Sequence, residues 1–262
     1  MAIVNATPDS FYSLSRTQSH DAVVARVREA IAEGATIIDI GGYSSRPNAD
    51  DVSVEEEWSR VEMALKATHA VSGEVAISVD TFRAEIVRRV VAQFGEIIVN
   101  DITAGEGDIE MLATVAELGV PYIAMHMRGT PQTMQKQAEY ADVTADVVSE
   151  LGVRLQAIEK AGIDLKRVVL DPGFGFAKTT EQNFELLAGL HRLKALGQPL
   201  LVGVSRKSMI YKTLGITPEE SLSATQAVHW EALRQGATLL RVHDVKEAVE
   251  TIKLYEKYDK GF

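Results

Sequence analysis

Residues 167–178 read RVVLDPGFGFAK, and residues 179–190 continue as TTEQNFELLAGL. The continuous apolar run 167–171 is typical of a strand that is buried on both faces of a parallel sheet. Glycine, proline and polar side chains follow at once, and residues 181–190 have the apolar spacing of an amphipathic helix. This stretch therefore predicts a buried strand, a polar loop and a helix, in that order.

The same order recurs along the whole chain. The predicted strands are residues 2–5, 36–40, 75–79, 97–100, 121–126, 167–171, 199–204 and 238–243. The predicted helices are residues 21–33, 54–71, 84–94, 109–118, 143–161, 181–190, 222–234 and 246–258. Eight such units in 262 residues match the usual size of a closed barrel of eight parallel strands, so we predict one α/β domain spanning residues 1–262. A doubly wound open sheet is the alternative, but polar clusters follow nearly every strand here, whereas that fold needs them after about two.

Composition excludes several classes of protein. The chain has 27 Lys and Arg against 37 Asp and Glu, a net charge of −10, which disfavours nucleic acid and anionic membranes as partners. It contains no cysteine, so disulfides, thiolate metal sites and cysteine nucleophiles are excluded, and a reducing cytoplasm is the expected location. No stretch approaches the roughly 18 apolar residues of a membrane span, and we expect no secretory leader at the start.

Polar residues gather where the predicted strands end. Asp80, Asn100 and Asp171 are short side chains at such ends, and in a parallel barrel these ends meet at one rim, where active sites lie. An Asp or Asn in this place can also merely cap the next helix. Together, however, their amide and carboxylate groups suit a flat heterocycle with donor and acceptor edges.

Basic residues form a second group on the same rim. The stretch SRKS, residues 205–208, ends one strand and opens a helix, so its backbone N–H groups and either Arg206 or Lys207 can hold an anion. Arg46, Arg241 and His243 flank it. Acidic and amide groups at the base of the site, with basic groups at its lip, predict a polar ring that carries a phosphate tail as the ligand.

Eight segments in this order resemble the dihydropteroate synthase family. They are AIVNATPDSF (2–11), TIIDIGGYSSRP (36–47), ISVDT (77–81), IIVNDI (97–102), MHMRGTPQTMQ (125–135), DPGFGFAK (171–178), GVSRKS (203–208) and RVHDV (241–245). The family belongs to the pterin-binding TIM barrels. It condenses 6-hydroxymethyl-7,8-dihydropterin pyrophosphate with 4-aminobenzoate to 7,8-dihydropteroate and pyrophosphate in folate biosynthesis. The resemblance implies a (β/α)8 TIM barrel and a transferase.

The resemblance also implies a role for individual residues. The pterin ring would contact Asp80, Asn100, Asp171, Lys207 and Arg241, with Arg241 stacked on it. The pyrophosphate would be held by Asn5, Arg46, Arg241 and His243, with Asn5 helping to bind the Mg²⁺ cofactor. The 4-aminobenzoate would lie near Ser45, Pro47, Phe176, Lys207 and Ser208. The residues implied in catalysis are Arg46, Asp80, Asp171, Lys207, Arg241 and His243.

The chemistry implied is dissociative. Pyrophosphate leaves first, stabilised by Mg²⁺ with Arg46, Arg241 and His243, and the aromatic amine then attacks the pterin cation. Asp80 and Asp171 would stabilise that cation. Loops 7–20 and 41–52 would close over the site and exclude water.

Three positions depart from the family pattern. Ser13 replaces an acidic residue, and Tyr43 and Ser45 stand where Glu and Thr are usual. Two alternatives therefore stay open: a methyltetrahydrofolate methyltransferase of the same barrel superfamily, which the SRKS and RVH segments disfavour, and a catalytically silent pterin-binding paralogue. The family is generally homodimeric and a sulfonamide target, so we expect a homodimer formed by the outer helices late in the chain.

Overall fold

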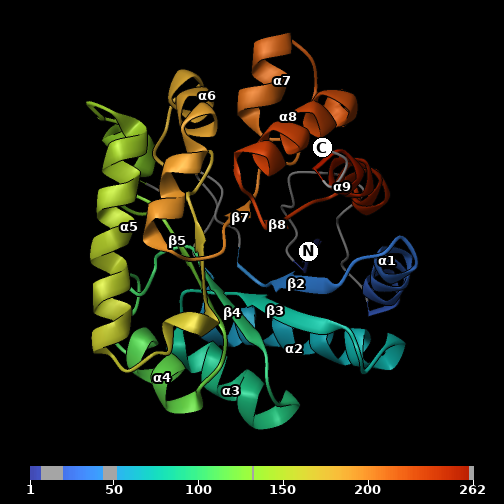
Figure 1. Cartoon of the computed structure of the whole chain (residues 1–262). Helices are drawn as coiled ribbons and strands as arrows, with labels where there is room; N and C mark the ends of the chain where they lie inside the picture. The colour runs from blue at the N-terminus through green and yellow to red at the C-terminus, as the bar shows by residue number, and fades with distance from the viewer. Residues whose placement is uncertain (7–19, 44–51, 132, 260–262) are drawn as a thin grey trace.

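Parallel strands alternate with helices along the chain in the computed structural model, which describes residues 1–6, 20–43, 52–131 and 133–259 (Figure 1). The strands within these residues are β1 (Ala2–Asn5), β2 (Ile37–Gly41), β3 (Ala76–Asp80), β4 (Ile98–Asp101), β5 (Tyr122–Met125), β6 (Val168–Asp171), β7 (Leu201–Val202) and β8 (Leu239–Leu240). Every pairing recorded between neighbouring strands is parallel.

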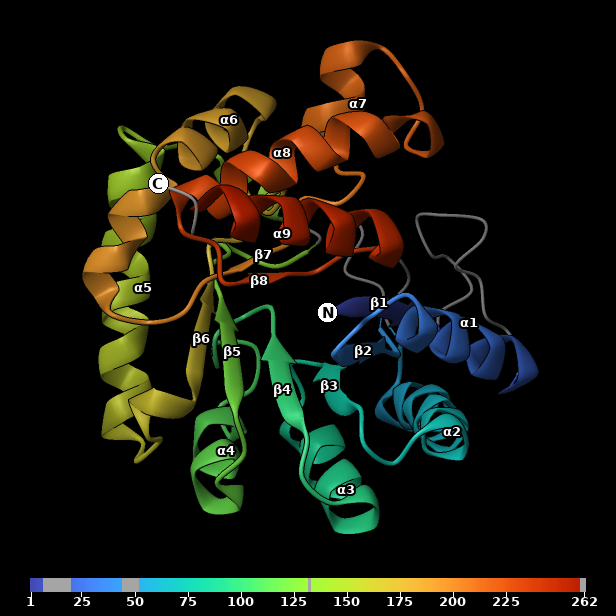
Figure 2. The ribbon, with the colours of Figure 1, turned by 45° about the vertical axis from the view of Figure 1, so that its right-hand side comes forward.

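The helices form a ring around the strands (Figures 1 and 2). They are α1 (His20–Ala32), α2 (Val54–Val71), α3 (Ala84–Phe94), α4 (Met111–Leu118), α5 (Val143–Lys160), α6 (Thr180–Ala188), α7 (Ser208–Leu214), α8 (Leu222–Gln235) and α9 (Val245–Asp259). Short 3₁₀ helices lie at η2 (Met134–Gln137), η3 (Leu165–Arg167), η4 (Leu190–Leu196) and η5 (Glu219–Ser221). Among the described residues, no helix combines the length and the apolar character that crossing a membrane requires.

Two sheets close into one barrel. Strands β1 to β6 form one sheet, and β7 pairs with β8 in a second. Leu170 of β6 pairs with Leu200 just before β7, and Ala2 of β1 pairs with Val242 just after β8. The amide of Ile3 donates to the carbonyl of Val242 over 3.0 Å, which joins the last strand to the first. The predicted closed barrel of eight parallel strands is thereby confirmed, and the open-sheet alternative is wrong.

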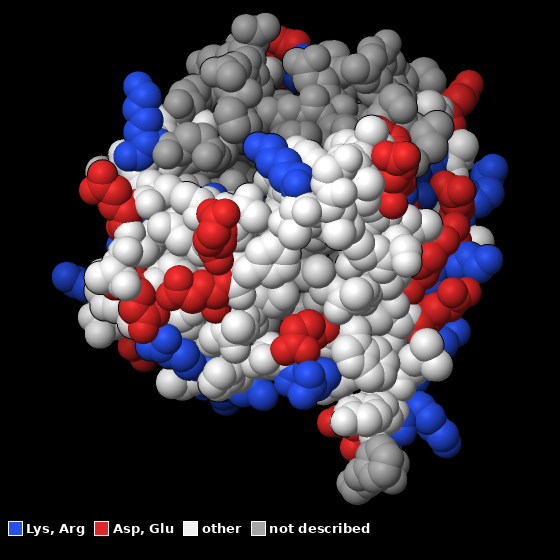
Figure 3. All heavy atoms as spheres, turned by 90° about the horizontal axis from the view of Figure 1, so that it is seen from above, with Lys and Arg blue, Asp and Glu red and all other residues white. Residues whose placement is uncertain are grey.

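Charged side chains on the outside are mixed in sign. Arg89 of α3 binds Glu55 of α2 over 2.7 Å, and Arg88 of the same helix binds Glu117 of α4 over 3.0 Å. Figure 3 looks onto the molecule from above, so the side of α7 and α8 comes forward, and it shows a largely uncharged area interrupted by a few charged side chains. The described part of this face therefore carries no broad patch of one sign.

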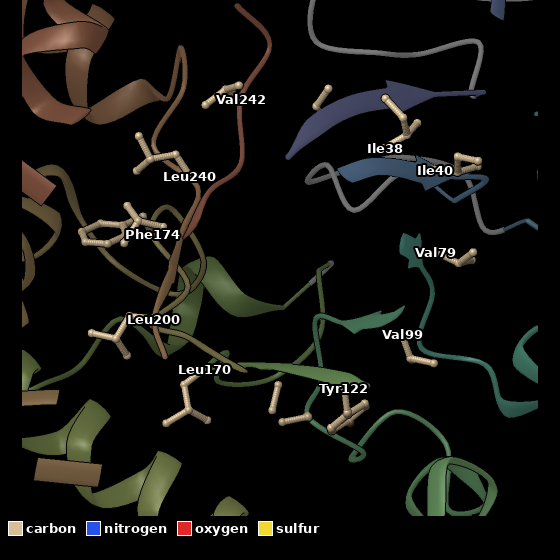
Figure 4. Packing of buried hydrophobic residues seen from close by; sticks show 14 of the residues in the cluster. Ile38, Ile40, Val79, Val99, Tyr122, Leu170, Phe174, Leu200, Leu240 and Val242 are labelled. Atoms are coloured by element: carbon tan, nitrogen blue, oxygen red, sulfur yellow. The ribbon is translucent and has the colours of Figure 1, made fainter. Parts of the chain in front are cut away.

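Alternate residues of each strand serve two different cores. Ile38, Ile40, Val79 and Val99 belong to the large cluster that packs the sheet against the helices (Figure 4). Intervening apolar residues of the strands form a separate cluster, which is expected for side chains that point to the opposite face and fill the barrel. Its members on the strands and beside them are Ile37, Ile98, Ile123, Val169, Leu201 and Leu239.

Some predicted boundaries are wrong. The strands predicted at 199–204 and 238–243 shorten to β7 and β8, since the chain turns toward α7 and α9 soon after Val202 and Leu240. The helix predicted from residue 109 begins at Met111 because the carboxylate of Asp108 accepts the amides of Ala84 and Glu110 and holds a turn there. The short helix α7 was not among the predicted helix ranges, although the SRKS segment was expected to open a helix.

A buried histidine on α8 predicts that stability falls in acid. His229 is completely buried, and burial lowers its pKa from 6.5 to about 4. Between these two pKa values the unfolded chain binds a proton at His229 that the folded chain does not bind. The stability that the neutral histidine allows is therefore fully present above pH 6.5 and is lost as pH falls toward 4. The difference in unfolding free energy between about pH 7 and about pH 5 should shrink by about 2 kcal/mol in His229→Leu, measured by urea denaturation.

The control for this measurement is the exposed His191, where His191→Gln should keep the acid sensitivity of the parent chain. An unchanged pH dependence in His229→Leu would contradict the assignment.

Candidate active site

Inside the barrel, a layer of polar side chains follows the apolar layer, two residues further along each of several strands. Ile37 is followed by Asp39, Ile98 by Asn100, Val169 by Asp171 and Leu239 by Arg241. Because side chains alternate along a strand, each polar residue shares the inner face with its apolar predecessor. The parallel register places Asp80 of β3 beside Asn100 of β4, and Asp171 of β6 beside Met125 of β5. A polar layer therefore lies at the carboxyl end of the strands.

Arg241 is the centre of this layer. Its Nε donates to Oδ2 of Asp39 over 2.6 Å, and its Nη2 donates to Oδ2 of Asp80 over 2.8 Å. Burial opposes the charge on Arg241, but the two carboxylates more than offset this and raise its pKa. Burial also raises the pKa of Asp80, against the effect of the guanidinium. The predicted stacking cation is thus held between two carboxylates from β2 and β3.

Asn100 is oriented by the same carboxylate. Its Nδ2 donates to both oxygens of Asp39 over 3.3 Å, and Asp39 itself is fully buried. Since a carboxylate can only accept, the amide nitrogen must face Asp39, which leaves Oδ1 as the acceptor of Asn100. Asp39 thereby orients a cation and an amide at once.

Asp171 and Lys207 meet on the opposite side of the barrel mouth. Asp171 is buried, its Oδ1 accepts the amide of Gly173 over 2.8 Å, and burial raises its pKa. Lys207 donates to the carbonyl of Phe174, and its Nζ lies 4.4 Å from the centre of the Phe176 ring. Burial lowers the pKa of Lys207 to about 8, although Asp171 favours its charged form. The ammonium therefore lies next to an aromatic ring and within electrostatic reach of a carboxylate.

His243 lies beside Arg241 as a neutral imidazole. Burial, and then the charge of Arg241, lower its pKa to about 3. Its amide donates to the hydroxyl of Ser205 over 3.1 Å, and that hydroxyl also lies 3.1 Å from Nδ1 of His243. Arg26 of α1 donates to the carbonyl of His243. We assign the ring proton to Nε2, because the Ser205 hydroxyl can then donate to Nδ1.

The other predicted site residues divide between described and undescribed parts of the chain. Asn5 ends β1, and its Oδ1 lies 3.2 Å from the place that a Cβ on Gly41 would occupy. Ser208 is the first residue of α7, directly after Lys207. The predicted site residues outside the described residues are Ser45, Arg46 and Pro47, together with Ser13 and most of loops 7–20 and 41–52.

Two rim cations have other partners. Arg206 is only 9% exposed, forms two hydrogen bonds with Asp244 over 2.8 and 2.7 Å, and donates to the carbonyls of Pro218 and Glu219. The expectation that Arg206 could hold an anion is therefore wrong, and Lys207 is the member of SRKS that faces the site. Lys178, the last residue of the DPGFGFAK segment, is 4% exposed and bound inside its own loop.

Sequence reasoning assigned no role to Asp39 or Glu57. Both are fully buried acids within apolar patterns: Asp39 stands among the isoleucines of β2, and Glu57 lies on the buried side of α2. Glu57 accepts from Thr81 over 2.6 Å and from Arg83 over 2.9 Å. A charged residue on an apolar face is the signal that could have found them, since such residues are buried only when paired.

Tyr43 also acquires a place in the structure. Its ring meets Phe82 edge-on with 5.0 Å between centroids, and the guanidinium of Arg83 lies 5.3 Å from the Tyr43 centroid. This tyrosine, which departs from the family pattern, therefore packs on the residues that follow β3.

Comparisons with known proteins agree on one family. Residues 1–243 match the family described as pterin binding enzyme. The dihydropteroate synthase of Escherichia coli (strain K12) is 45% identical over 259 residues, which cover 98% of this chain and 90% of that protein. The Yersinia pestis dihydropteroate synthase, solved with a sulfonamide drug complex, has a TM-score of 0.94 at 36% identity, covering 99% of this chain and 94% of that one.

The dihydropteroate synthase of Xanthomonas albilineans is also similar. Its structure with 4-aminobenzoic acid has a TM-score of 0.90 at 41% identity, and its complex with 7,8-dihydropteroate has a TM-score of 0.86 at 39% identity. Both alignments cover 99% of this chain and 92% of the other.

The bonds of Asp39 predict a large cost for removing its charge. In Asp39→Asn the half-buried Arg241 keeps only Asp80 as an ionic partner, and breaking a pair with a buried carboxylate costs roughly 3 kcal/mol of unfolding free energy. Urea denaturation at neutral pH measures this loss. The matched control is Glu55→Gln, which weakens the exposed ion pair with Arg89 and should leave the unfolding free energy within error. Equal small effects in both variants would show that the Asp39 pair is not central.

Proposed function

The chain belongs to the pterin-binding enzymes and, within them, to the dihydropteroate synthases, and from this premise we propose how its barrel carries out the reaction of that family. The enzyme is a transferase that joins 6-hydroxymethyl-7,8-dihydropterin pyrophosphate to 4-aminobenzoate and releases pyrophosphate. The observation that carries this function is the polar layer of Asp80, Asn100, Asp171 and Arg241 next to Lys207.

Pterin recognition uses the acceptors of this layer. A pterin presents an amino group and ring N–H groups on one edge, and buried carboxylates such as Asp171 are acceptors for them. The acceptor Oδ1 of Asn100 and the donor Nζ of Lys207 add groups of both kinds. Asp39 and Asp80 fix the orientation of the Arg241 guanidinium, which preorganises its plane for stacking on the ring.

Pyrophosphate is proposed to bind beside this layer, at Arg241 and His243. A neutral His243 with its proton on Nε2 donates one hydrogen bond to a phosphate oxygen without adding charge. Arg46 is proposed as a further contact and lies outside the described residues. These donors stabilise negative charge as it develops on the leaving group.

The residues at the end of β1 fit a magnesium ion carried by the substrate. The oxygens of Asn5 and Asp80 both lie near Gly41, at 3.2 and 3.9 Å from the place of a missing Cβ. Within the described residues, no group of three or more His, Asp or Glu is placed to hold a metal. Mg²⁺ commonly keeps several waters and binds substrate phosphates through one or two protein oxygens. When bound, it would supply charge that stabilises the departing pyrophosphate.

The balance of charge in the layer favours a dissociative reaction. The layer has three carboxyl groups, on Asp39, Asp80 and Asp171, against two cations, Arg241 and Lys207. Carboxyl oxygens directed at the pterin stabilise the cation that remains after pyrophosphate leaves. The weakly nucleophilic amine of 4-aminobenzoate then attacks this cation. We propose this order for the reaction.

The aminobenzoate is proposed to lie on the Phe176 side of Lys207, with Ser208 at its carboxylate. The short distance from Nζ of Lys207 to the Phe176 ring brings a cation and an apolar surface together, which suits an aromatic acid. Sulfonamides, bound by the Yersinia pestis relative, are proposed to compete for the same place.

No observation favours the methyltransferase alternative. A cytoplasmic location stays a prediction.

A homodimer is proposed through the late helices. Leu254 and Tyr258 of α9 are 66% and 51% exposed, and Tyr258 packs beside Trp230 of α8. Light scattering should give twice the 28.6 kDa mass of one chain, and Leu254→Asp should lower it toward one chain. A single-chain mass for the unaltered protein would contradict the dimer.

A turnover assay tests the function. With both substrates and Mg²⁺ present, the protein should release pyrophosphate and form 7,8-dihydropteroate. Asp171→Asn removes a negative charge that stabilises the pterin cation, so kcat/KM should fall on the order of a hundredfold with the fold retained by circular dichroism. Glu181→Gln on the exposed start of α6 is the control and should leave the rate unchanged.

Two outcomes separate the alternatives in this assay. Pterin binding in calorimetry without pyrophosphate release would identify a silent paralogue. Absence of both binding and release in the folded protein would sink the proposed function.

A further inference from the structure

A buried lysine lies behind the loop that joins β6 to α6. Nζ of Lys178 is 3.0 Å from Nδ1 of His126, 3.0 Å from the carbonyl of Gly173 and 3.1 Å from the carbonyl of Phe176. An ammonium has three N–H donors and no acceptor, so these three acceptors use all of them. Lys178 therefore ties the beginning and the end of its own loop to the end of β5.

His126 connects Lys178 to α5 through a second hydrogen bond. Its Nε2 lies 2.9 Å from Oε2 of Glu150, and Arg128 donates from Nε to Oε1 of the same carboxylate over 3.0 Å. Burial opposes the charge of Glu150, but His126 and Arg128 more than offset this and lower its pKa to about 2. The ionised Glu150 can only accept, so the proton of His126 lies on Nε2 and Nδ1 accepts from Lys178.

The loop turns through three residues with positive φ, and one of them, Ala177, is strained. Gly173, Gly175 and Ala177 have φ values of +70°, +81° and +49°. A Cβ on Gly173 would lie 1.9 Å from the carbonyl oxygen of His126, so the loop also presses closely on β5. Ala177 has a Cβ and still adopts the left-handed region, which costs roughly 1–2 kcal/mol. Such a conformation persists only where the surroundings determine it.

The other side of the same loop faces the proposed substrates. The carbonyl of Phe174 accepts from Lys207, and the Phe176 ring lies under the ammonium of Lys207. Asp171, in contrast, belongs to β6 and is anchored by its pairing with Met125 of β5. The loop alone therefore positions Phe176, whereas Asp171 is held by the strand as well as by the amide of Gly173.

We propose that Lys178 is a positioning residue that holds Phe176 in place for 4-aminobenzoate, and this proposal rests on the function proposed above. It acts through the loop backbone and does not touch the substrate. Because the sheet still holds the backbone of Asp171 when Lys178 is lost, the loss affects the aminobenzoate side of the site more than the pterin side.

The surroundings of Lys178 act on its pKa in opposite directions. Burial lowers its pKa to about 7, while Asp171 and Glu150 favour the charged form and Lys207 and Arg128 oppose it. The hydrogen bonds to two carbonyls and to an unprotonated imidazole nitrogen require the three donors of the charged form. An uncharged side chain of similar length therefore tests the tie directly.

The test compares Lys178→Met with the exposed control Lys166→Met. In Lys178→Met we expect the KM for 4-aminobenzoate to rise roughly tenfold or more, from the loss of charged hydrogen bonds, with a clearly smaller rise in the Kd for the pterin substrate. Hydrogen exchange of the amides of residues 173–177 should accelerate, and this readout does not depend on activity. Lys166→Met should match the unaltered protein in all three measurements.

The outcomes separate this proposal from the proposed function. Absence of turnover in the unaltered protein contradicts the function alone, since hydrogen exchange still tests the tie. Unchanged exchange, or an equal loss of affinity for both substrates, overturns the role of Lys178. Should Lys178→Met fail to fold, Glu150→Ala removes the partner of His126 near the surface. It should raise the aminobenzoate KM by about threefold with a smaller effect on the pterin, and an equal effect on both substrates overturns the proposal.

Discussion

The ion pairs of Arg241 with Asp39 and Asp80 constrain the rest of the site. A guanidinium inside a barrel is tolerated only where carboxylates offset its desolvation, and the two partners lie 2.6 and 2.8 Å away. These bonds connect the last strand to β2 and β3 across the lumen. They also place Asp39 where it orients Asn100, so one buried cation determines the positions of three other polar groups. The arrangement of these polar groups therefore depends on the closure of the barrel.

Two lysines then determine the opposite wall. Lys207 faces the lumen and binds the carbonyl of Phe174, while Lys178 lies behind the same loop and binds the carbonyls of Gly173 and Phe176. Lys178 is buried and Lys207 is half-buried, and burial lowers both pKa values. The strained loop between them is held from both sides, which explains how Ala177 occupies the left-handed region. Rigidity on this wall comes from hydrogen bonds, because the loop itself has no regular secondary structure.

The sequence was informative where a residue type and its place on a strand agree. Asp80, Asn100, Asp171 and Arg241 lie on strands or directly after them, so their convergence follows from the parallel barrel and is confirmed by the register and by their bonds. Arg206 and Lys207 are adjacent and chemically alike, yet only the backbone at Arg206, with φ of +53°, turns its side chain toward Asp244. Neighbouring cations in one segment could not be told apart by pattern, because a local turn decides where each points.

The alternation of strands and helices by itself determined the eight parallel strands, their order and the rim on which the chemistry gathers, since hydrophobic periodicity and strand ends are local properties. Which buried acids pair with which cations was decided only by the tertiary structure. Asp39 and Arg241 are 202 residues apart in the chain, and His126 and Lys178 are 52 residues apart. The local sequence around each residue does not indicate its partner. Ion pairs and hydrogen bonds act over a few ångströms in space, so they depend on the closed barrel that brings distant strands together.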